Sequence, residues 1–290
     1  MRKALTILLI IAALLIGGYV GFISGQHGPV PKGPILKITF LRASLGGGVI
    51  VKTPENRFTV IDPGAARTSD ALVKYLNSEK VKTLDILITN PTSTNSAACN
   101  ALMRSFRVRR IMSGEKQGRS RTWRRVIANA ERKGISMSQI VAERTINLSN
   151  TTELHVLAPP QGLLQSVSSE SDDNSLVFKI TFGRKRFLFT SEITERGEAW
   201  LVKSGSDVES DVLIVPRSGH STAASLELLS KVRPDYCVIT SSNTPNRSLL
   251  ERLNEKNTGA RLFRTDKNGT ISIVSDGRTI AVITERDGRD

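Results

Sequence analysis

Short runs of β-branched residues alternate with helix-like segments through most of this chain, and this alternation constrains its fold more than any other feature. In the first half, strands are predicted over residues 35–41, 49–53, 58–62, 84–89 and 108–112, and helices over 69–78, 95–106 and 121–133. In the second half, strands are predicted over 154–157, 175–181, 186–190, 212–215, 236–240, 261–264, 269–274 and 278–284, and helices over 196–203, 223–232 and 248–255. Strands mixed with helices in two successive halves indicate an α/β fold, with two sheets and helices outside them.

The N-terminus follows a different pattern. Residues 4–23 carry no charge and are almost wholly apolar, and at about 1.5 Å per residue they reach about 30 Å, one hydrocarbon thickness. Arg2 and Lys3 precede this stretch, so the positive-inside rule keeps the N-terminus in the cytoplasm and sends the rest across. A cleaved signal peptide is the alternative, although residues 21–25 lack a clear small-x-small cleavage site. We expect a membrane anchor over 1–25, a linker over 26–33 and one extracytoplasmic domain over 34–290.

The composition favours an anionic partner. The chain has 41 Lys and Arg residues against 27 Asp and Glu residues, a formal net charge of +14, which suits nucleic acid, anionic lipid or an acidic polymer. Its two cysteines, Cys99 and Cys237, exclude a disulfide scaffold. We expect both to be buried free thiols, and one bridge between them is the alternative.

Most of the excess positive charge lies between residues 104 and 133, where eleven Lys and Arg residues face two Glu residues. Arginine is abundant there, and its planar guanidinium matches phosphate oxygens bidentately. Trp123 is a candidate for stacking on a nucleic-acid base. The proposed polyanion-binding residues are Arg107, Arg109, Arg110, Lys116, Arg119, Arg121, Trp123, Arg124 and Arg125. A solvated helix face, or contact with an anionic membrane surface, is the competing interpretation.

A series of short motifs runs through the chain in order: Gly46-Gly47-Gly48, Ile61-Asp62-Pro63-Gly64, Asn174-Ser175-Leu176-Val177 and Asn268-Gly269-Thr270. Their order and spacing, from about Leu36 to Asp276, resemble the metallo-β-lactamase-like domain of ComEC-type competence proteins. The resemblance implies an αββα sandwich with metal ions, zinc for this family, in loops along one edge between the sheets. It also implies that the basic loop before Trp123 lies near the mouth of the site.

The family's metal ligands are largely replaced. Where the family has His-x-Asp-x-Asp-His, this chain has Asn-Pro-Thr-Ser-Thr-Asn at residues 90–95. Neutral amides and hydroxyls are poor zinc ligands compared with imidazole, thiolate and carboxylate. The altered ligand positions are Asn90, Thr92, Thr94, Asn95, Glu192, Arg217 and Ser218. Asp62 persists, and the resemblance implies that it supports the loop. Without the ligands, a metal-activated water is not expected.

We therefore predict that no cofactor is bound and that the domain is a non-catalytic pseudoenzyme, which binds a polymer such as DNA in a competence or DNA-uptake setting. Two alternatives stay open. One is a hydrolase of the same superfamily with an altered site around Glu192, Asp62 and His220. The other is an interaction module for a second envelope protein, with the basic surface docking on an acidic partner. His27, in the predicted linker, and His155, on a predicted strand, are expected to lie outside the site.

Overall fold

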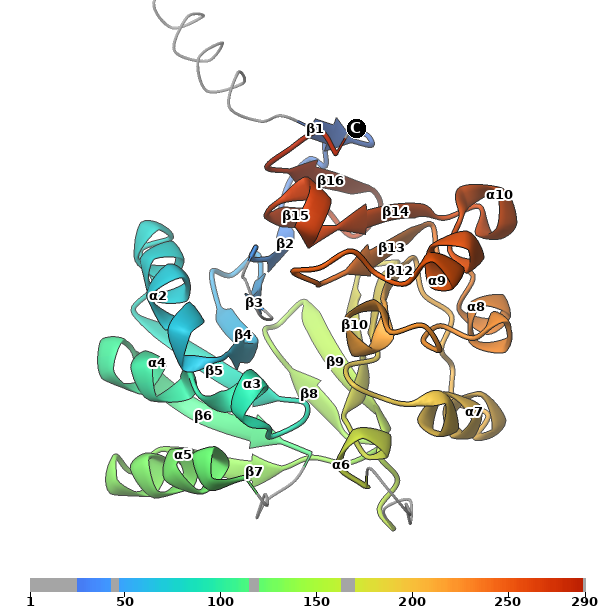
Figure 1. The fold of residues 1–290 in the computed structure, drawn as a ribbon. Coiled ribbons are helices and arrows are strands. Elements are labelled where there is room, and N and C mark those ends of the chain that lie inside the picture. Colours follow the sequence, from blue (N-terminus) through green and yellow to red (C-terminus); the bar gives the residue numbers. More distant parts are fainter. Residues whose placement is uncertain (1–24, 43–46, 115–119, 163–169, 289–290) are drawn as a thin grey trace, which may run out of the picture.

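Two β-sheets pack face to face, and helices cover both outer faces (Figure 1). The structure is a computed structural model that describes residues 25–42, 47–114, 120–162 and 170–288. No helix within these ranges is both long and apolar enough to cross a membrane. The predicted anchor segment, residues 4–23, lies outside the described residues.

The first sheet has nine strands in the order β1-β16-β15-β2-β3-β4-β5-β6-β7. Their bounds are β1 Gly25–His27, β2 Leu36–Phe40, β3 Gly47–Lys52, β4 Phe58–Gly64, β5 Thr83–Ile88, β6 Arg107–Ser113, β7 Ser136–Gln139, β15 Ile271–Ser275 and β16 Ile280–Thr284. Strands β2, β3 and β4 pair antiparallel, and β4 to β7 pair parallel. The associated helical segments are η1 Ala66–Thr68, α2 Ser69–Ser78, α3 Ser93–Ser96, α4 Cys99–Ser105 and α5 Arg121–Arg132.

The second sheet repeats this plan with seven strands in the order β14-β13-β12-β11-β10-β9-β8. Their bounds are β8 Thr145–Asn147, β9 Thr152–Ala158, β10 Val177–Phe182, β11 Lys185–Phe189, β12 Val212–Ile214, β13 Tyr236–Ile239 and β14 Arg261–Arg264. Strands β9 to β11 pair antiparallel, and β11 to β14 pair parallel. The helical segments are α6 Glu170–Asp173, α7 Glu195–Lys203, η2 Pro216–Gly219, α8 Leu226–Val232, α9 Arg247–Arg252, α10 Glu255–Thr258 and α11 Thr265–Asn268.

Three apolar layers hold the sandwich together. The central layer lies between the sheets, where the rings of Phe178 and Phe189 stack with their centroids 4.7 Å apart. A second layer joins the second sheet to α7, α8 and α9, and a third joins the first sheet to α2, α4 and α5. Each fully buried Leu, Ile or Phe side chain contributes about 1.5–3 kcal/mol. Cys99 and Cys237 are buried free thiols in the two outer layers, as expected from the sequence.

Strands β7 and β8 and the short helices α6, α10 and α11 were not predicted, and three other segments also differ from the prediction. The expected helix over 95–106 is divided into α3 and α4, because the amide of Ala98 donates to the carbonyl of Gly64 on β4 at 3.0 Å. The expected helix from residue 223 begins at Leu226, since Ala224 has a φ of 52° and Ser225 caps the helix. The predicted linker starts with an edge strand, in which Gln26 pairs with Ile283 of β16.

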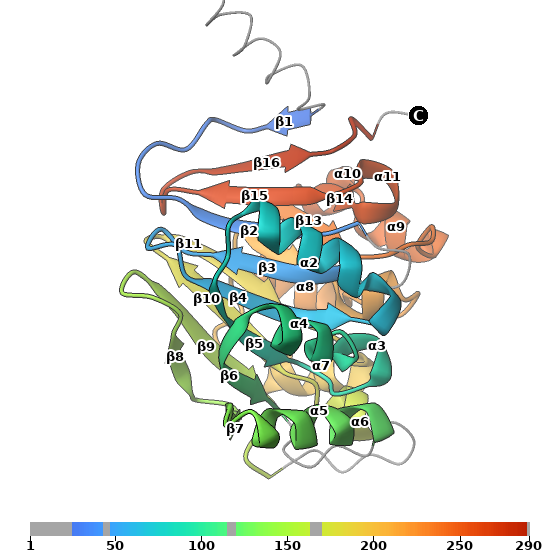
Figure 2. The ribbon, with the colours of Figure 1, turned by 90° about the vertical axis from the view of Figure 1, so that its left-hand side faces the viewer.

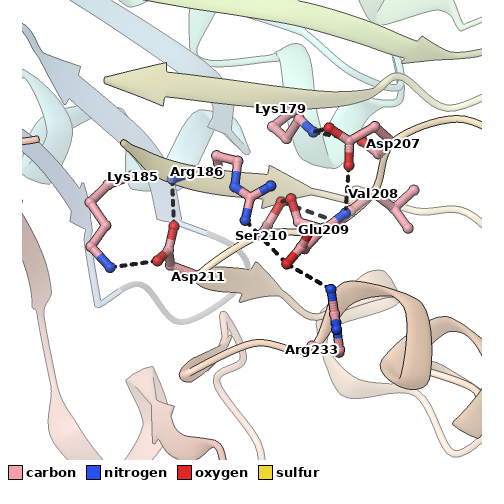
Figure 3. Close-up of polar contacts among 9 residues, drawn as sticks. All are labelled: Lys179, Lys185, Arg186, Asp207, Val208, Glu209, Ser210, Asp211 and Arg233. Atoms are coloured by element: carbon pink, nitrogen blue, oxygen red, sulfur yellow. Dashed lines mark hydrogen bonds and ion pairs between the residues drawn. The ribbon is translucent and has the colours of Figure 1, made fainter. Parts of the chain in front are cut away.

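An ion-pair network joins the segment that precedes β12 to its neighbours (Figure 3). The pairs are Asp207 with Lys179, Glu209 with Arg186 and Arg233, and Asp211 with Lys185. The Lys179 side chain is 7% exposed, and its Nζ donates both to Asp207 Oδ2 at 2.6 Å and to the Asp207 carbonyl at 2.7 Å. These contacts tie the segment that leads into β12 to β10, β11 and the residue after α8.

Candidate functional site

A pocket of about 350 Å³ opens between the two sheets, at the carboxyl ends of their parallel strands. Open α/β sheets commonly bind ligands at this place, because loops after successive strands converge there. The first sheet contributes residues at the end of β4 and after β5, and the second contributes the loops after β11, β12 and β13. The polar lining residues are Asp62, Thr94, Asn95, Ser191, Glu192, Ser218, Thr240, Ser241, Ser242 and Asn243.

The altered ligand positions do gather around this pocket, but not all of them face it. Thr94, Asn95, Glu192 and Ser218 line it. Thr92 shares a hydrogen bond of 2.8 Å with the Thr94 hydroxyl, beside the lining. The remaining two positions, Asn90 and Arg217, are not lining residues.

Asn90 stands at the first of these positions and is almost fully buried, with 1% of its surface exposed. Its Nδ2 donates to Asp172 Oδ1 at 2.8 Å. Its Oδ1 is buried and accepts no hydrogen bond from any described residue. The amide therefore joins the loop after β5 to the α6 segment.

Asp62 and Glu192 are the two carboxyl groups of the pocket. Asp62 Oδ1 accepts from the Thr89 amide at 2.9 Å, and Oδ2 accepts from the Thr89 hydroxyl at 2.5 Å. Asp62 thus holds the start of the loop after β5. Burial, with a smaller contribution from the negative charge of Glu192, raises the pKa of Asp62 to about 7. Burial and the charge of Asp172 raise the pKa of Glu192, while the Arg217 guanidinium acts in the opposite direction.

These donors do not fit the zinc site that the resemblance implies. Zinc sites in proteins use three or four His, Cys, Asp or Glu side chains. The described residues include no group of three such side chains placed to hold a metal ion. The pocket supplies two carboxyls, and both oxygens of Asp62 already accept hydrogen bonds from Thr89. The remaining lining groups are hydroxyls and amides, which are weak zinc ligands.

The histidines do not complete the site. His220 is exposed, its Nδ1 lies 3.1 Å from the Thr222 hydroxyl, and it does not line the pocket. His155 lies on β9 with Nδ1 3.1 Å from the Thr145 hydroxyl, and His27 lies on β1 with Nδ1 2.7 Å from Arg261 Nη2. The alternative site therefore has two of its three groups, Asp62 and Glu192, at the pocket.

The backbone around the pocket is unusual in a way that the sequence did not signal. Asp62, Ser191, Arg217 and Ser218 all have φ between 43° and 51°, a region that residues with a Cβ rarely adopt. Each such residue costs about 1–3 kcal/mol, and the conformation persists only where contacts of the surrounding structure offset that cost. One support is the 2.8 Å hydrogen bond from the Arg217 amide to the Ser191 carbonyl. Ser191 and residues 240–242 line the pocket but were not among the predicted site residues; their only signal in the sequence is that each segment follows a buried strand.

The proposed polyanion-binding residues between 104 and 133 do not form one exposed surface. Trp123 is 0% exposed and packs in the layer between α5 and the first sheet, so its predicted role in base stacking is wrong. Arg109 and Arg110 both bind Asp85, which is itself 1% exposed. Arg109 donates to the two Asp85 oxygens at 2.9 and 2.7 Å, and Arg110 Nε donates at 2.9 Å. These two guanidiniums are already engaged within the fold.

Among the remaining described cations of the segment, Arg132 donates from Nη2 to Asn129 Oδ1, whereas four of the proposed polyanion-binding residues form no ion pair with a described residue. Arg107, Arg121, Arg124 and Arg125 are exposed, and no carboxylate in the described ranges lies within ion-pair distance of them. Arg121, Arg124 and Arg125 belong to α5, which lies on the outer face of the first sheet (Figure 2). Lys116 and Arg119 lie outside the described residues. Arg107 begins β6 and so lies at the end of the sheet away from the pocket, whereas α5 follows the pocket end of β6.

Comparisons with known proteins give two competence proteins as relatives. The chain is 21% identical to ComE operon protein 3 of Bacillus subtilis over 206 residues, which are 69% of this chain and 26% of that protein. It is 32% identical to competence protein ComA of Neisseria gonorrhoeae over 108 residues, which are 34% of this chain and 15% of that protein. The chain thus matches about a quarter or less of the length of either relative. No model of a protein family matches it.

Solved structures share the fold. A putative metal-dependent hydrolase from Parabacteroides distasonis matches 84% of this chain and 99% of its own, with a TM-score of 0.53 and 12% identity. A mutant of the β-hydroxylase CmlA matches 84% of this chain and 54% of its own, with the same TM-score and identity. The αββα arrangement observed here is the one expected from the sequence resemblance. The chain therefore has a metallo-β-lactamase-like fold and is related in sequence to the competence proteins ComE operon protein 3 and ComA.

Proposed function

We propose that this chain is a non-catalytic metallo-β-lactamase-fold domain that binds DNA, or a similar phosphate polymer, through the exposed arginines of α5. The observation that carries the proposal is the unpaired state of Arg121, Arg124 and Arg125 within the described part of the chain. The first turn of α5 contains no acidic residue and begins with an arginine. Cations at a helix N-terminus are unfavourable by about 0.3–1 kcal/mol, because they oppose the positive end of the helix dipole. A bound phosphate offsets this cost.

The competence relatives support a role in DNA uptake, and the apolar residues 4–23 support a membrane anchor with the domain outside the cytoplasm. A tethered domain with a basic surface holds DNA at the cell surface without chemistry of its own. The anchor is tested by protease treatment of intact spheroplasts. Digestion of the domain in intact spheroplasts supports this topology, and protection of the domain until the membrane is lysed contradicts it.

The binding test uses the full chain in a non-ionic detergent and a labelled 20-base-pair duplex, followed by fluorescence anisotropy over a series of salt concentrations. The test variant is Arg121→Glu, Arg124→Glu and Arg125→Glu combined. Each phosphate contact contributes about −0.9 to the slope of log K against log salt. Loss of all three contacts therefore reduces the slope by about 2.7, and charge reversal weakens binding further.

A matched control variant changes the same amount of charge elsewhere. Arg196→Glu, Lys203→Glu and Lys231→Glu lie on exposed positions of α7 and α8, in the other helical layer (Figure 1). We expect this variant to bind DNA with nearly the wild-type slope. Equal losses in both variants indicate only general electrostatic attraction. Absence of binding at low salt refutes DNA as the ligand and leaves an acidic protein partner as the interpretation of the basic surface.

The non-catalytic part of the proposal is tested separately by equilibrium dialysis against zinc, with metal content measured by mass spectrometry. We expect far less than one zinc per chain. Near-stoichiometric zinc that is lost in a Glu192→Gln variant indicates the altered hydrolase site instead. A phosphodiesterase assay on the same samples then shows whether the bound metal supports hydrolysis.

A further inference from the structure

The basic surface of α5 has no aromatic ring on it. Trp123 is the one aromatic residue of α5 by sequence, and it points into the apolar layer beneath the helix with Val126 and Ala130. The exposed large apolar side chains of the described residues are Val30 and Leu226, neither of which is aromatic. The undescribed segments 43–46, 115–119 and 163–169 contain no Phe, Trp or Tyr by sequence.

Stacking is the main means by which proteins prefer single strands. A base stacked on an aromatic ring contributes about 1–3 kcal/mol, equivalent to about 5- to 150-fold in affinity per base. A surface without exposed rings forgoes this contribution. Such a surface also favours the nucleic acid with the higher density of phosphates, which is the duplex, because duplex DNA carries one phosphate per about 1.7 Å of its axis.

The shape and charge of α5 match a line of phosphates. Four exposed arginines follow one side of the helix, because Arg124, Arg125 and Arg132 lie three, four and eleven residues after Arg121. With a rise of about 1.5 Å per residue, Arg121 and Arg132 are separated by about 16 Å along the axis, roughly half a turn of duplex DNA. Arg104, at the end of α4, is exposed as well.

The two neighbouring arginines of β6, Arg109 and Arg110, are engaged within the fold. Asp85 is buried and accepts three hydrogen bonds from Arg109 and Arg110. Arg110 also donates to the carbonyl of Asn147 on β8, in the second sheet. Bidentate contact with a guanine edge needs a free guanidinium fork. Arg109 uses both Nε and Nη2 on Asp85, so its fork is occupied.

We infer that the chain recognises DNA through its phosphates alone, with no contact to the bases, and therefore binds duplex at least as tightly as single strands and without sequence preference. This inference rests on the proposed function. It specifies the ligand as the sugar-phosphate backbone of duplex DNA, read by Arg121, Arg124, Arg125 and Arg132.

The deciding experiment compares strands that share phosphates and differ in bases. The full chain is titrated by anisotropy with a 20-nucleotide single strand, an abasic strand of equal length, and two 20-base-pair duplexes of unrelated sequence. We expect the abasic strand to bind within about twofold of the strand with bases. We expect the two duplexes to agree within about twofold and to bind no more weakly than the single strand.

The variant Trp123→Phe provides a second measurement. The indole Nε1 has no hydrogen-bond partner in the described part of the chain, so the substitution removes no hydrogen bond there. We expect folding and DNA affinity to be retained within about twofold. A tenfold loss on the abasic strand, or a tenfold loss of single-strand binding in a folded Trp123→Phe protein, overturns the inference while leaving the proposed function intact. Failure of every DNA probe to bind overturns the proposed function itself.

Discussion

Stability of this domain should fall as the pH rises from 5 to 8, and Glu192→Gln should reduce that fall. The pKa of Asp62 is raised from 3.8 to about 7 by burial and by the charge of Glu192. A carboxyl with a raised pKa binds its proton more tightly in the folded state. Its contribution to stability is therefore complete below pH 3.8 and is lost as the pH rises through 7.

The size of the effect follows from that shift. A shift of about three units, at about 1.4 kcal/mol per unit, sets an upper limit of about 4 kcal/mol for the loss from Asp62. The pKa of Glu192 is also raised, so it adds to the loss in the same direction. Replacing Glu192 with Gln removes one of the two charges and lowers the pKa of Asp62. We expect the decrease between pH 5 and pH 8 to shrink by about 1–3 kcal/mol.

Urea unfolding at pH 5, 6, 7 and 8 gives the free energy of unfolding of each protein, and carboxyl NMR chemical shifts give the pKa of Asp62 directly. The matched control is Glu153→Gln, an exposed carboxylate on β9 away from the pocket. We expect the control to keep the wild-type pH dependence. Parallel stability curves for wild type and Glu192→Gln, or an Asp62 pKa near 4, would refute the coupling of the two carboxyls.

Three further predictions concern ion pairs outside the pocket. Asp85→Ala removes a buried carboxylate that accepts hydrogen bonds from two guanidiniums, which are themselves 39% and 34% exposed and stay in contact with water. The free energy of unfolding should therefore decrease by about 1–3 kcal/mol in urea titrations, and a change under about 0.5 kcal/mol would contradict a structural role. Two lysines hold the pKa of Glu79 at about 2, so the stabilisation by Glu79 is present above pH 4.5 and is lost as the pH falls towards 2. Glu79→Gln should therefore reduce the loss of stability at acid pH, measured by circular dichroism, and an unchanged midpoint of acid unfolding would count against this. Asp207→Ala should cost about 1–3 kcal/mol because it leaves the buried Lys179 ammonium unpaired, while Lys179→Met should be nearly neutral; thermal unfolding that ranks them in reverse order would contradict the network in Figure 3.

The orientation of α5 could have been predicted correctly from the sequence. Trp123, Val126 and Ala130 recur at helical spacing, which marks the face of α5 that packs on the sheet. The same spacing places Arg121, Arg124 and Arg125 on the solvent side. The engagement of Arg109 and Arg110 left no such signal, since their partner Asp85 belongs to a different strand and meets them only through the pairing of β5 with β6.

The sequence by itself determined an α/β class with two sheets and the bounds of α2, because apolar periodicity is a local property of a chain. The αββα arrangement, which is observed, and the replacement of the metal ligands were expected from the resemblance to ComEC-type competence proteins. Tertiary structure decided what depends on distant partners. It divided the helix near residue 98 through a hydrogen bond to β4, and it made residues 25–27 an edge strand on β16. It also brought Asp62 and Glu192 to one pocket, where burial raises the pKa of both; the charge of Glu192 adds to the rise for Asp62, and the charge of Asp172 adds to the rise for Glu192. Burial and electrostatic coupling act through space, and no local pattern of residues records them.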